Sequence, residues 1–248
     1  MNISTTENRK LMAQARESLK GNWGVAVGAN LISTMLSSVV SFIFYFICGC
    51  ILGVIIIVPL YYILLMFEVD QTVIDAVTEF VARVIPFPTL TGPFIFGLIG
   101  FYLSLSRGQE FKLEQIFNGF KKGKFVKSFL AGFYVWLFVF LWSLLCIIPG
   151  IIKAYSYLLT FWIMADDDSI SPLEAITKSR EMMDGNKFKS FCLGWRFFGW
   201  GLLSLLTCFI GSLWLGPYIN VSYTKFYEDI KNSKSKAIKR TTSKKVYW

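Results

Sequence analysis

Charged residues are missing from long stretches of this 248-residue chain. Five runs contain no Lys, Arg, Asp or Glu, namely residues 21–67, 84–106, 128–152, 154–165 and 197–224. A helix needs about 20 apolar residues to cross the hydrocarbon of a bilayer, so several runs are long enough. A soluble domain could not cover so many apolar helices when only 17% of its residues are charged. The runs therefore predict an all-α, polytopic membrane protein.

The positive charges lie in four clusters that alternate with the uncharged runs. Of the 25 Lys and Arg residues, 22 lie in residues 1–23, 107–127, 166–189 and 225–248. Short loops rich in Lys and Arg stay in the cytoplasm, so these clusters and both termini are expected on the cytoplasmic side of the cell membrane. Residues 68–83 carry four acidic residues and one Arg, and we expect this segment outside.

A short amphipathic segment followed by an out-and-back apolar hairpin occurs three times. Each returning helix is expected to begin near a tight turn marked by Gly92-Pro93, Pro149-Gly150 or Gly216-Pro217. This pattern predicts six transmembrane helices as three hairpins, each preceded by a cytoplasmic amphipathic helix. The amphipathic helices are expected at residues 4–20, 109–120 and 171–184, and the approximate repeats at residues 4–106, 109–165 and 169–228.

Each of these three helices is expected to carry a stripe of apolar residues along one face. The first stripe is interleaved with basic residues and suits the inner membrane surface. The third helix opens with a capping box at Ser171 and Glu174, with Pro172 at the first helical position. The stripes consist of Leu11, Ala15 and Leu19, then Leu113, Ile116, Phe117 and Phe120, then Leu173, Ile176 and Met183.

The chain is expected to form one integral membrane domain, residues 1–230, and a basic cytoplasmic tail, residues 231–248, that is disordered or held loosely against anionic lipid. Residues 48–91 form an external or re-entrant insertion, in which residues 70–85 suit an external amphipathic helix. If residues 49–67 also cross, the chain has seven spans and an external N-terminus. Six spans are favoured because they keep all 22 clustered basic residues inside.

The chain lacks the residues and motifs that several kinds of catalysis and ligand binding require. The chain has no histidine, which is the commonest general base and metal ligand near neutral pH. No nucleotide-binding loop or nucleophile elbow is present, and the basic clusters alternate with spans, so we expect no enzyme, no cofactor, no metal and no nucleic acid. The five cysteines lack zinc-ligand spacing and are expected as free thiols: Cys48, Cys50, Cys146, Cys192 and Cys208.

Two basic residues lie inside apolar runs, where a charge is costly and marks a site. Lys153 is expected at shallow depth on the external side, and Arg196 about 13 Å beyond Lys187. With Asn220 they are candidate contacts for an anionic ligand, such as a lipid phosphate or a peptide C-terminus. Alternatively, both basic side chains extend to the nearest interface.

Asp166–Asp168 could bind a divalent cation, but a solvated loop before the next helix is favoured.

Five motifs occur in an order and spacing that resembles a known family. They are LKGNWG (19–24), GPFIFGLIGFYLSLSRGQE (92–110), IIPGIIKAYSYLLTFWIMAD (147–166), SREMMDGNKFKSF (179–191) and GPYINVSYTKFYEDI (216–230). Together they are similar to the bacterial integral membrane family known as domain of unknown function 975. The resemblance covers residues 9–230 and departs at residues 48–91, which are longer and more apolar than expected. It implies a multi-span plasma-membrane protein and brings no catalytic residues.

The sequence favours a non-enzymatic membrane protein that binds lipid or a membrane-active peptide, or that acts as an accessory or immunity-type protein. Its expected partners are membrane lipids, with anionic lipid at the cytoplasmic face. The alternative is a small transporter or exporter component, which repeated hairpins would suit.

Overall fold

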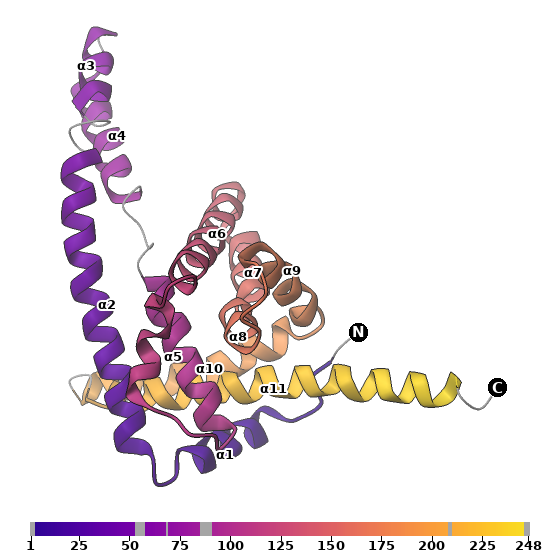
Figure 1. The fold of residues 1–248 in the computed structure, drawn as a ribbon. Coiled ribbons are helices and arrows are strands. Elements are labelled where there is room, and N and C mark those ends of the chain that lie inside the picture. Colours follow the sequence, from indigo (N-terminus) through magenta and orange to yellow (C-terminus); the bar gives the residue numbers. More distant parts are fainter. Residues whose placement is uncertain (1–2, 53–57, 68, 85–90, 208–209, 246–248) are drawn as a thin grey trace.

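The computed structural model describes residues 3–52, 58–67, 69–84, 91–207 and 210–245, and these ranges contain helices and no strand (Figure 1). The expected all-α class is confirmed. In chain order the elements are α1 (Asn8–Leu19), α2 (Trp23–Leu52), α3 (Val58–Met66), α4 (Gln71–Val84), α5 (Thr91–Ser106), the 3-10 helix η2 (Leu113–Phe120), α6 (Lys124–Leu145), α7 (Ile147–Tyr157), α8 (Thr160–Asp166), α9 (Pro172–Met183), α10 (Lys187–Leu206) and α11 (Ser212–Lys245).

Three helical stretches among the described residues are long and apolar enough to cross a membrane. They are Trp23–Phe44 in α2, Lys124–Leu145 (α6) and Ile147–Asp166, which joins α7 and α8. The apolar helix α5 is shorter, at Thr91–Ser106. Six spans in three hairpins therefore stay a prediction. The predicted choice at residues 49–67 includes residues 53–57, which lie outside the described residues.

Helix α5 forms the centre of the fold and contacts α1, α2, α6, α8 and α11. It also packs closely on η2. A Cβ atom at Gly97 would meet the Ile116 carbonyl oxygen at 1.8 Å, and one at Gly119 would meet the Pro93 carbonyl oxygen at 2.0 Å. Glycine at both positions permits this approach of two backbones. The segment expected as an amphipathic helix at residues 109–120 is thus a 3-10 helix that is held against α5.

The predicted stripe of α1 is present, but it contacts protein. Leu11, Ala15 and Leu19 are all buried, and α1 lies against α11 and α5. The expectation that this stripe lies on the inner membrane surface is therefore wrong, because the tertiary fold covers it. The helix remains amphipathic, with its basic residues on the outer side.

Helix α9 begins as the sequence predicts. The backbone N–H of Glu174 donates to the Ser171 hydroxyl at 3.3 Å, and Pro172 occupies the first turn. Ile176 and Met183 are buried, whereas Leu173 is half exposed. The capping interaction fixes where α9 starts, and its apolar stripe packs against α6, α7 and α8.

Three glycines join a short helix to a long one in the same way. Gly21, Gly123 and Gly185 have φ of 82°, 86° and 77°, and they precede α2, α6 and α10 respectively. A left-handed backbone favours glycine, because a side chain there clashes with the following carbonyl. The three positions therefore set the direction in which each long helix departs.

The Gly/Pro pairs differ from their predicted role. Pro93 and Pro149 lie in the first turns of α5 and α7, and Pro217 lies inside α11. Helix starts tolerate proline because the first N–H groups have no intrahelical partner. Each returning helix begins near its pair, as predicted, but the pairs lie within helices, so the prediction of tight turns at the pairs is wrong.

The two segments expected to be peripheral are both helical. α4 confirms the predicted helix at residues 70–85; it packs on α3, and its Ile74 side chain is buried. α11 continues through Lys245 as one helix, so the prediction of a disordered tail is wrong for residues 231–245. No Gly or Pro follows Pro217, and nothing in this segment interrupts helix propagation.

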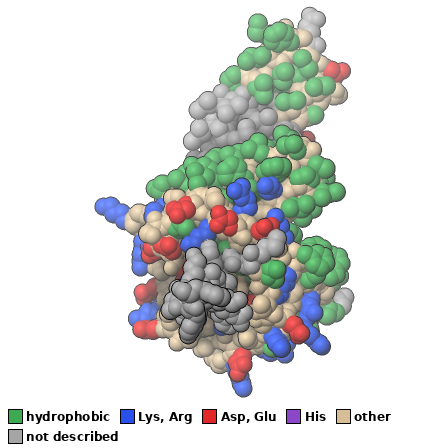
Figure 2. Space-filling model, turned by 90° about the vertical axis from the view of Figure 1, so that its right-hand side faces the viewer, with side chains coloured by type: hydrophobic (Ala, Val, Ile, Leu, Met, Phe, Trp, Pro, Cys, Tyr) green, Lys and Arg blue, Asp and Glu red, His purple; other side chains and the backbone are tan. Residues whose placement is uncertain are grey.

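The surface is polarised along the length of the molecule. Figure 2 shows charged side chains gathered over the lower part of the molecule, where α11 lies, and hydrophobic side chains over the upper, distal part, which contains α3, α4 and, in Figure 1, the outer end of α2. Exposed apolar residues on that distal part include Met35, Phe42, Phe46, Tyr62 and Met66. Such a continuous apolar surface suits lipid contact.

Candidate functional site: a tryptophan-lined pocket and its polar surroundings

The three residues predicted to bind an anion lie in different surroundings. The Lys153 ammonium lies 4.4 Å from the centroid of the Trp142 ring. Arg196 is exposed on α10, with no hydrogen bond or ion pair to the described residues. The Asn220 amide donates to the Gly216 carbonyl of its own helix at 3.0 Å. No described pocket contains two of them, so they form no common site, and their roles stay predictions.

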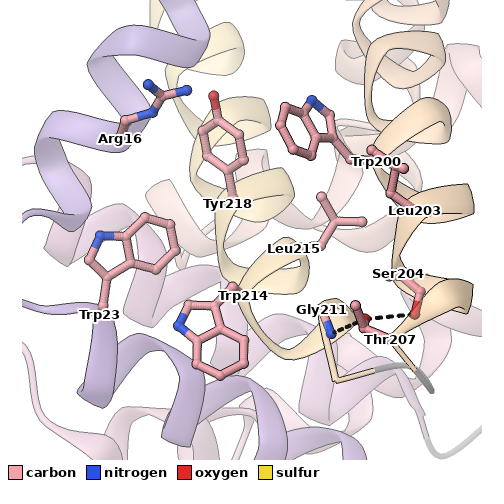
Figure 3. Close-up of a pocket in the computed structure, with 10 residues that line it drawn as sticks. All are labelled: Arg16, Trp23, Trp200, Leu203, Ser204, Thr207, Gly211, Trp214, Leu215 and Tyr218. Carbon is pink, nitrogen blue, oxygen red and sulfur yellow. Dashed lines mark hydrogen bonds between the residues drawn. The ribbon is translucent and has the colours of Figure 1, made fainter.

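A mainly apolar pocket of about 350 Å³ lies between α10, α11 and the junction of α1 with α2 (Figure 3). We call it the tryptophan pocket. Three indole rings and several aliphatic groups form its walls, and one arginine is its only charged residue. Its lining consists of Arg16, Trp23, Trp200, Leu203, Ser204, Thr207, Gly211, Trp214, Leu215 and Tyr218.

Two polar groups of the tryptophan pocket, on Arg16 and Tyr218, have no hydrogen-bond partner among the described residues. The Arg16 guanidinium lies 5.8 Å from the centroid of the Tyr218 ring, and no carboxylate of the described chain pairs with it. The Tyr218 hydroxyl is buried and has no hydrogen-bond partner. Figure 3 shows this hydroxyl turned toward Arg16. A buried polar group without a partner costs about 1–3 kcal/mol, so a bound acceptor would be favoured here.

Local structure holds the walls of the tryptophan pocket in place. The Thr207 hydroxyl donates to the Ser204 carbonyl at 3.0 Å and accepts from the Gly211 N–H at 3.2 Å, which fixes the end of α10 (Figure 3). At Gly216, a Cβ atom would meet the Asn30 amide nitrogen at 2.5 Å, so α11 lies close against α2. The left-handed Gly21 places Trp23 on the opposite wall.

Two pockets bring together elements that were expected on opposite faces of the membrane. Arg16, expected inside, shares the tryptophan pocket with Gly211, expected near an external turn. Lys153, expected outside, shares a pocket with Arg180 of the supposedly cytoplasmic α9. Residues that line one pocket cannot lie on opposite sides of a bilayer about 30 Å thick. The depths assigned to these segments are therefore wrong, because sequence alone gives no tilt or crossing of helices.

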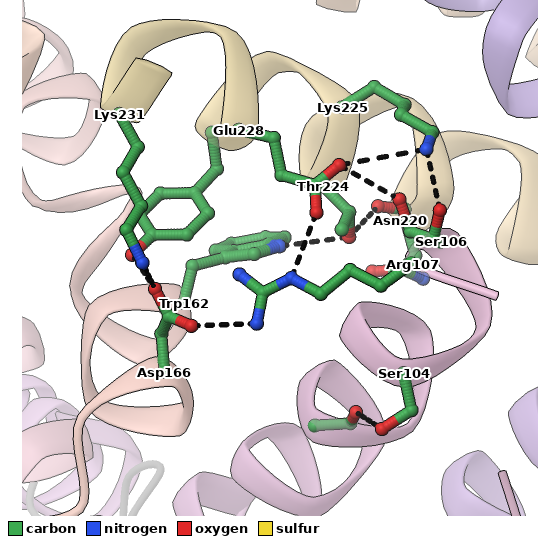
Figure 4. A network of polar contacts seen from close by, with 12 residues as sticks. Ser104, Ser106, Arg107, Trp162, Asp166, Asn220, Thr224, Lys225, Glu228 and Lys231 are labelled. Atoms are coloured by element: carbon green, nitrogen blue, oxygen red, sulfur yellow. Dashed lines mark hydrogen bonds and ion pairs between the residues drawn. The ribbon is translucent and has the colours of Figure 1, made fainter. Parts of the chain in front are cut away.

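An ionic cluster joins the ends of α5 and α8 to α11 (Figure 4). Arg107 donates to Asp166 at 2.8 Å and to Glu228 at 3.0 Å. Lys231 and the Tyr227 hydroxyl also donate to Asp166. Each charged side chain of the cluster therefore has a partner of opposite charge. The cluster links three segments that the positive charges had placed together in the cytoplasm.

Neighbouring contacts support the same grouping. Next to the cluster, the Trp162 indole donates to the Thr224 hydroxyl at 3.0 Å (Figure 4). The Lys225 ammonium donates to the Ser106 carbonyl at 2.7 Å. These bonds fix α11 against α5 and α8 over more than one turn.

The N-terminal segment is tied to α10 and α11. The hydroxyls of Ser4 and Thr6 donate to the Asp229 carboxylate at 2.5 and 2.6 Å, and Lys189 donates to the Ser4 carbonyl at 3.0 Å. Burial raises the pKa of Asp229, but the hydrogen bonds from Ser4 and Thr6 outweigh it, so that pKa is lowered. The carboxylate is therefore ionised and holds the segment at neutral pH.

The three adjacent carboxylates considered for a divalent cation point to different partners. Asp166 belongs to the ionic cluster. Asp167 accepts hydrogen bonds from Ser169, and Asp168 pairs with Lys124 at 2.5 Å. Since each has its own partner, they do not converge on one point.

The sequence reasoning missed the residues that line the tryptophan pocket and form the cluster. A signal was present for part of them, because Arg107, Asp166 and Glu228 all lie in the quoted family motifs. No signal paired Trp23 with Trp214, which are far apart in the chain. Periodicity identifies faces of helices but not which faces meet.

Comparisons with known proteins give one family. A family model described as "Protein of unknown function (DUF975)" matches residues 1–161 and residues 145–234. No curated protein and no solved structure matches the chain.

Proposed function

The chain belongs to the DUF975 family, and from that premise we propose that it is a non-enzymatic, multi-span cell-membrane protein that binds an anionic amphiphile in the tryptophan pocket. The amphiphile has an apolar body and one acidic head group, a carboxylate or a phosphodiester. Both termini lie in the cytoplasm.

One observation carries this proposal: an apolar cavity is lined by the exposed Arg16 and by the buried Tyr218 hydroxyl, and neither group has a hydrogen-bond partner among the described residues. Ligand pockets are mainly apolar and contain a few polar groups that orient the ligand. Arg16 and Tyr218 can both donate to an oxyanion, and Arg can do so with two parallel bonds. The indoles supply apolar area and suit the interfacial region of a membrane.

The proposed membrane setting rests on two further features. Three helical stretches among the described residues have the length and composition of spans. The basic segments at Arg107, Lys124, Lys189 and Lys231 all contact acidic or polar partners at the charged half of the molecule. A single cytoplasmic side for these segments agrees with their charge.

Binding can be measured by tryptophan quenching. The purified full-length protein in detergent is titrated with a brominated fatty acid and with the corresponding brominated fatty alcohol, which lacks the charge. We expect the acid to quench at lower concentration than the alcohol. Arg16→Gln should weaken binding of the acid by about tenfold, on the scale of about 1.5–3 kcal/mol for hydrogen bonds to charged groups, and leave the alcohol unchanged.

Two variants control this experiment. Arg196→Gln removes an exposed arginine without a described partner and should not change the titration. Tyr218→Phe should weaken binding of the acid without opening the pocket, because only the hydroxyl is lost. Equal affinities of acid and alcohol for the wild-type protein would refute an anionic head group, and absence of quenching would refute the pocket.

A further inference from the structure

A second pocket contains two cations and no anion. It has a volume of about 300 Å³ and lies between α6, α7 and α9. Its lining consists of Phe138, Trp142, Lys153, Tyr157, Leu173, Ile176, Thr177 and Arg180. We call it the Lys153–Arg180 pocket. It shares no residue with the tryptophan pocket.

Donors exceed acceptors in the Lys153–Arg180 pocket. Lys153 carries three N–H groups and Arg180 five, and neither side chain makes a hydrogen bond or ion pair to the described residues. The Thr177 hydroxyl already donates to the Leu173 carbonyl at 3.0 Å. No carboxylate lines the pocket.

Contact with Trp142 does not satisfy Lys153. The ammonium lies 4.4 Å from the ring centroid, and an aromatic face attracts a cation without accepting its separate N–H bonds as an oxyanion does. The contact instead fixes the ammonium at the pocket wall. Because α9 starts at the capped Ser171, Arg180 is also held on a defined helix.

Two like charges at one cavity repel each other unless an anion lies between them. We propose that the Lys153–Arg180 pocket binds a phosphate group, whose oxygens accept from both cations at once. A phosphate fits better than a carboxylate because it has more acceptor oxygens and more negative charge. The inference is independent of the tryptophan pocket.

The phosphate can come from solution or from a lipid, and two arms of one experiment separate these sources. In the first arm, calorimetric titration of the full-length protein in detergent uses inorganic phosphate. In the second arm, the protein is placed in phosphatidylcholine nanodiscs with or without phosphatidic acid, and bound phosphatidic acid is measured by native mass spectrometry. Binding in either arm supports the site when variants of Lys153 and Arg180 weaken it, and the arm in which it occurs identifies the source of the phosphate.

The variants test the geometry. Lys153→Gln and Arg180→Gln should each weaken phosphate binding by about tenfold, and Lys153→Arg, which keeps the charge, should change it by less than about threefold. Arg196→Gln is the matched control, because it removes an exposed arginine that lines neither pocket and should leave phosphate binding unchanged. High salt should weaken the wild-type interaction.

Two results would overturn the inference. One is a wild-type protein that binds phosphate in neither arm. The other is a double variant, Lys153→Gln with Arg180→Gln, that folds with the wild-type melting temperature and binds as the wild-type protein does. A loss of phosphate binding in Arg196→Gln equal to that in Lys153→Gln would show a non-specific effect of charge and would also refute this site.

Discussion

Arg107 is the residue on which the junction of three helices depends. Arg107 directly follows the end of α5. Its Nη1 donates to Asp166 of α8 and its Nε donates to Glu228 of α11. The planar guanidinium can face two carboxylates at once, which a single ammonium cannot do. Burial lowers the pKa of Arg107, but the hydrogen bonds and charges of Asp166 and Glu228 outweigh it, so that pKa is raised.

We predict that Arg107→Gln destabilises the protein by about 1–3 kcal/mol, because it removes a charged partner from two partly buried carboxylates. Arg107→Lys should lose less, since one of the two contacts can be kept. The melting temperature of the purified protein in detergent measures both. Arg196→Gln is the control and should melt with the wild-type protein; if Arg107→Gln does the same, the cluster does not stabilise the fold.

Two glycines of α5 offer a matched test of the close packing on η2. An added Cβ at Gly97 would overlap the Ile116 backbone, whereas one at Gly100 has no atom within 4 Å. We predict that Gly97→Ala costs about 1–3 kcal/mol through overpacking. Gly100→Ala should be neutral or gain up to about 1 kcal/mol from helix propensity. Thermal unfolding distinguishes them, and similar melting temperatures would argue against this packing.

The roles of residues that depend on their neighbours in the sequence were predictable, and the roles that depend on tertiary contacts were not. The Ser171 cap and the glycines after α1 and α9 follow from short-range backbone rules. The partners of Lys153 and Arg16 come from other helices, which no local rule identifies. Asn220 was predicted as a ligand contact because it is polar within an apolar run, yet its amide bonds to its own helix.

At the scale of elements, the N-terminal segment, here called the strap, lies across the start of α10 and the charged part of α11. Its residues Ser4 and Thr6 make the contacts. Its polar partners are Asp229, Lys189 and Asn186, whose side-chain amide oxygen accepts from the Ser4 N–H at 2.8 Å. Local opening of such a segment costs less than unfolding of the core.

The strap should be released by acid. Because the pKa of Asp229 is lowered in the folded protein, its contribution is complete above the ordinary aspartate pKa of about 4 and is lost as pH falls through the folded-state value. A spin label at an Ile3→Cys position, in a protein without native cysteines, reports the mobility of the strap. We expect low mobility at pH 7 and high mobility at acidic pH.

Asp229→Asn should make the spin label mobile at pH 7, since the amide retains shape but not charge. The remainder of the protein should stay folded, which the melting temperature verifies. If the variant keeps a rigid label at pH 7, the carboxylate does not hold the strap.

Element types were predicted better than element surroundings. Hydrophobic periodicity located α1, α4 and α9, because apolar stripes recur at helical spacing. The same periodicity failed at η2, where glycines allow a tight 3-10 path along α5. It also could not show that α11 remains helical beyond residue 230, because a polar helix and a disordered polar tail have similar composition.

For the whole molecule, sidedness is the property most open to test. The Lys and Arg distribution predicts that Gln109, Asp168 and Lys234 face the cytoplasm and that Asp75 faces outward. Single cysteines at these positions are labelled with an impermeant reagent in intact and in permeabilised cells. We expect labelling of position 75 in intact cells and of the other three only after permeabilisation; labelling of position 168 in intact cells would reject the cytoplasmic assignment.

The ionic cluster also sets an order of events during biosynthesis. Arg107 and Asp166 are synthesised well before Glu228 and Lys231. The pair that they form therefore lacks its partners on α11 while the chain is still growing. A chain that stops before α11 leaves a half-paired cluster, an unheld N-terminus and an open face of α5. Helix α11 is therefore the element that completes the charge pairing of the cluster and covers α5.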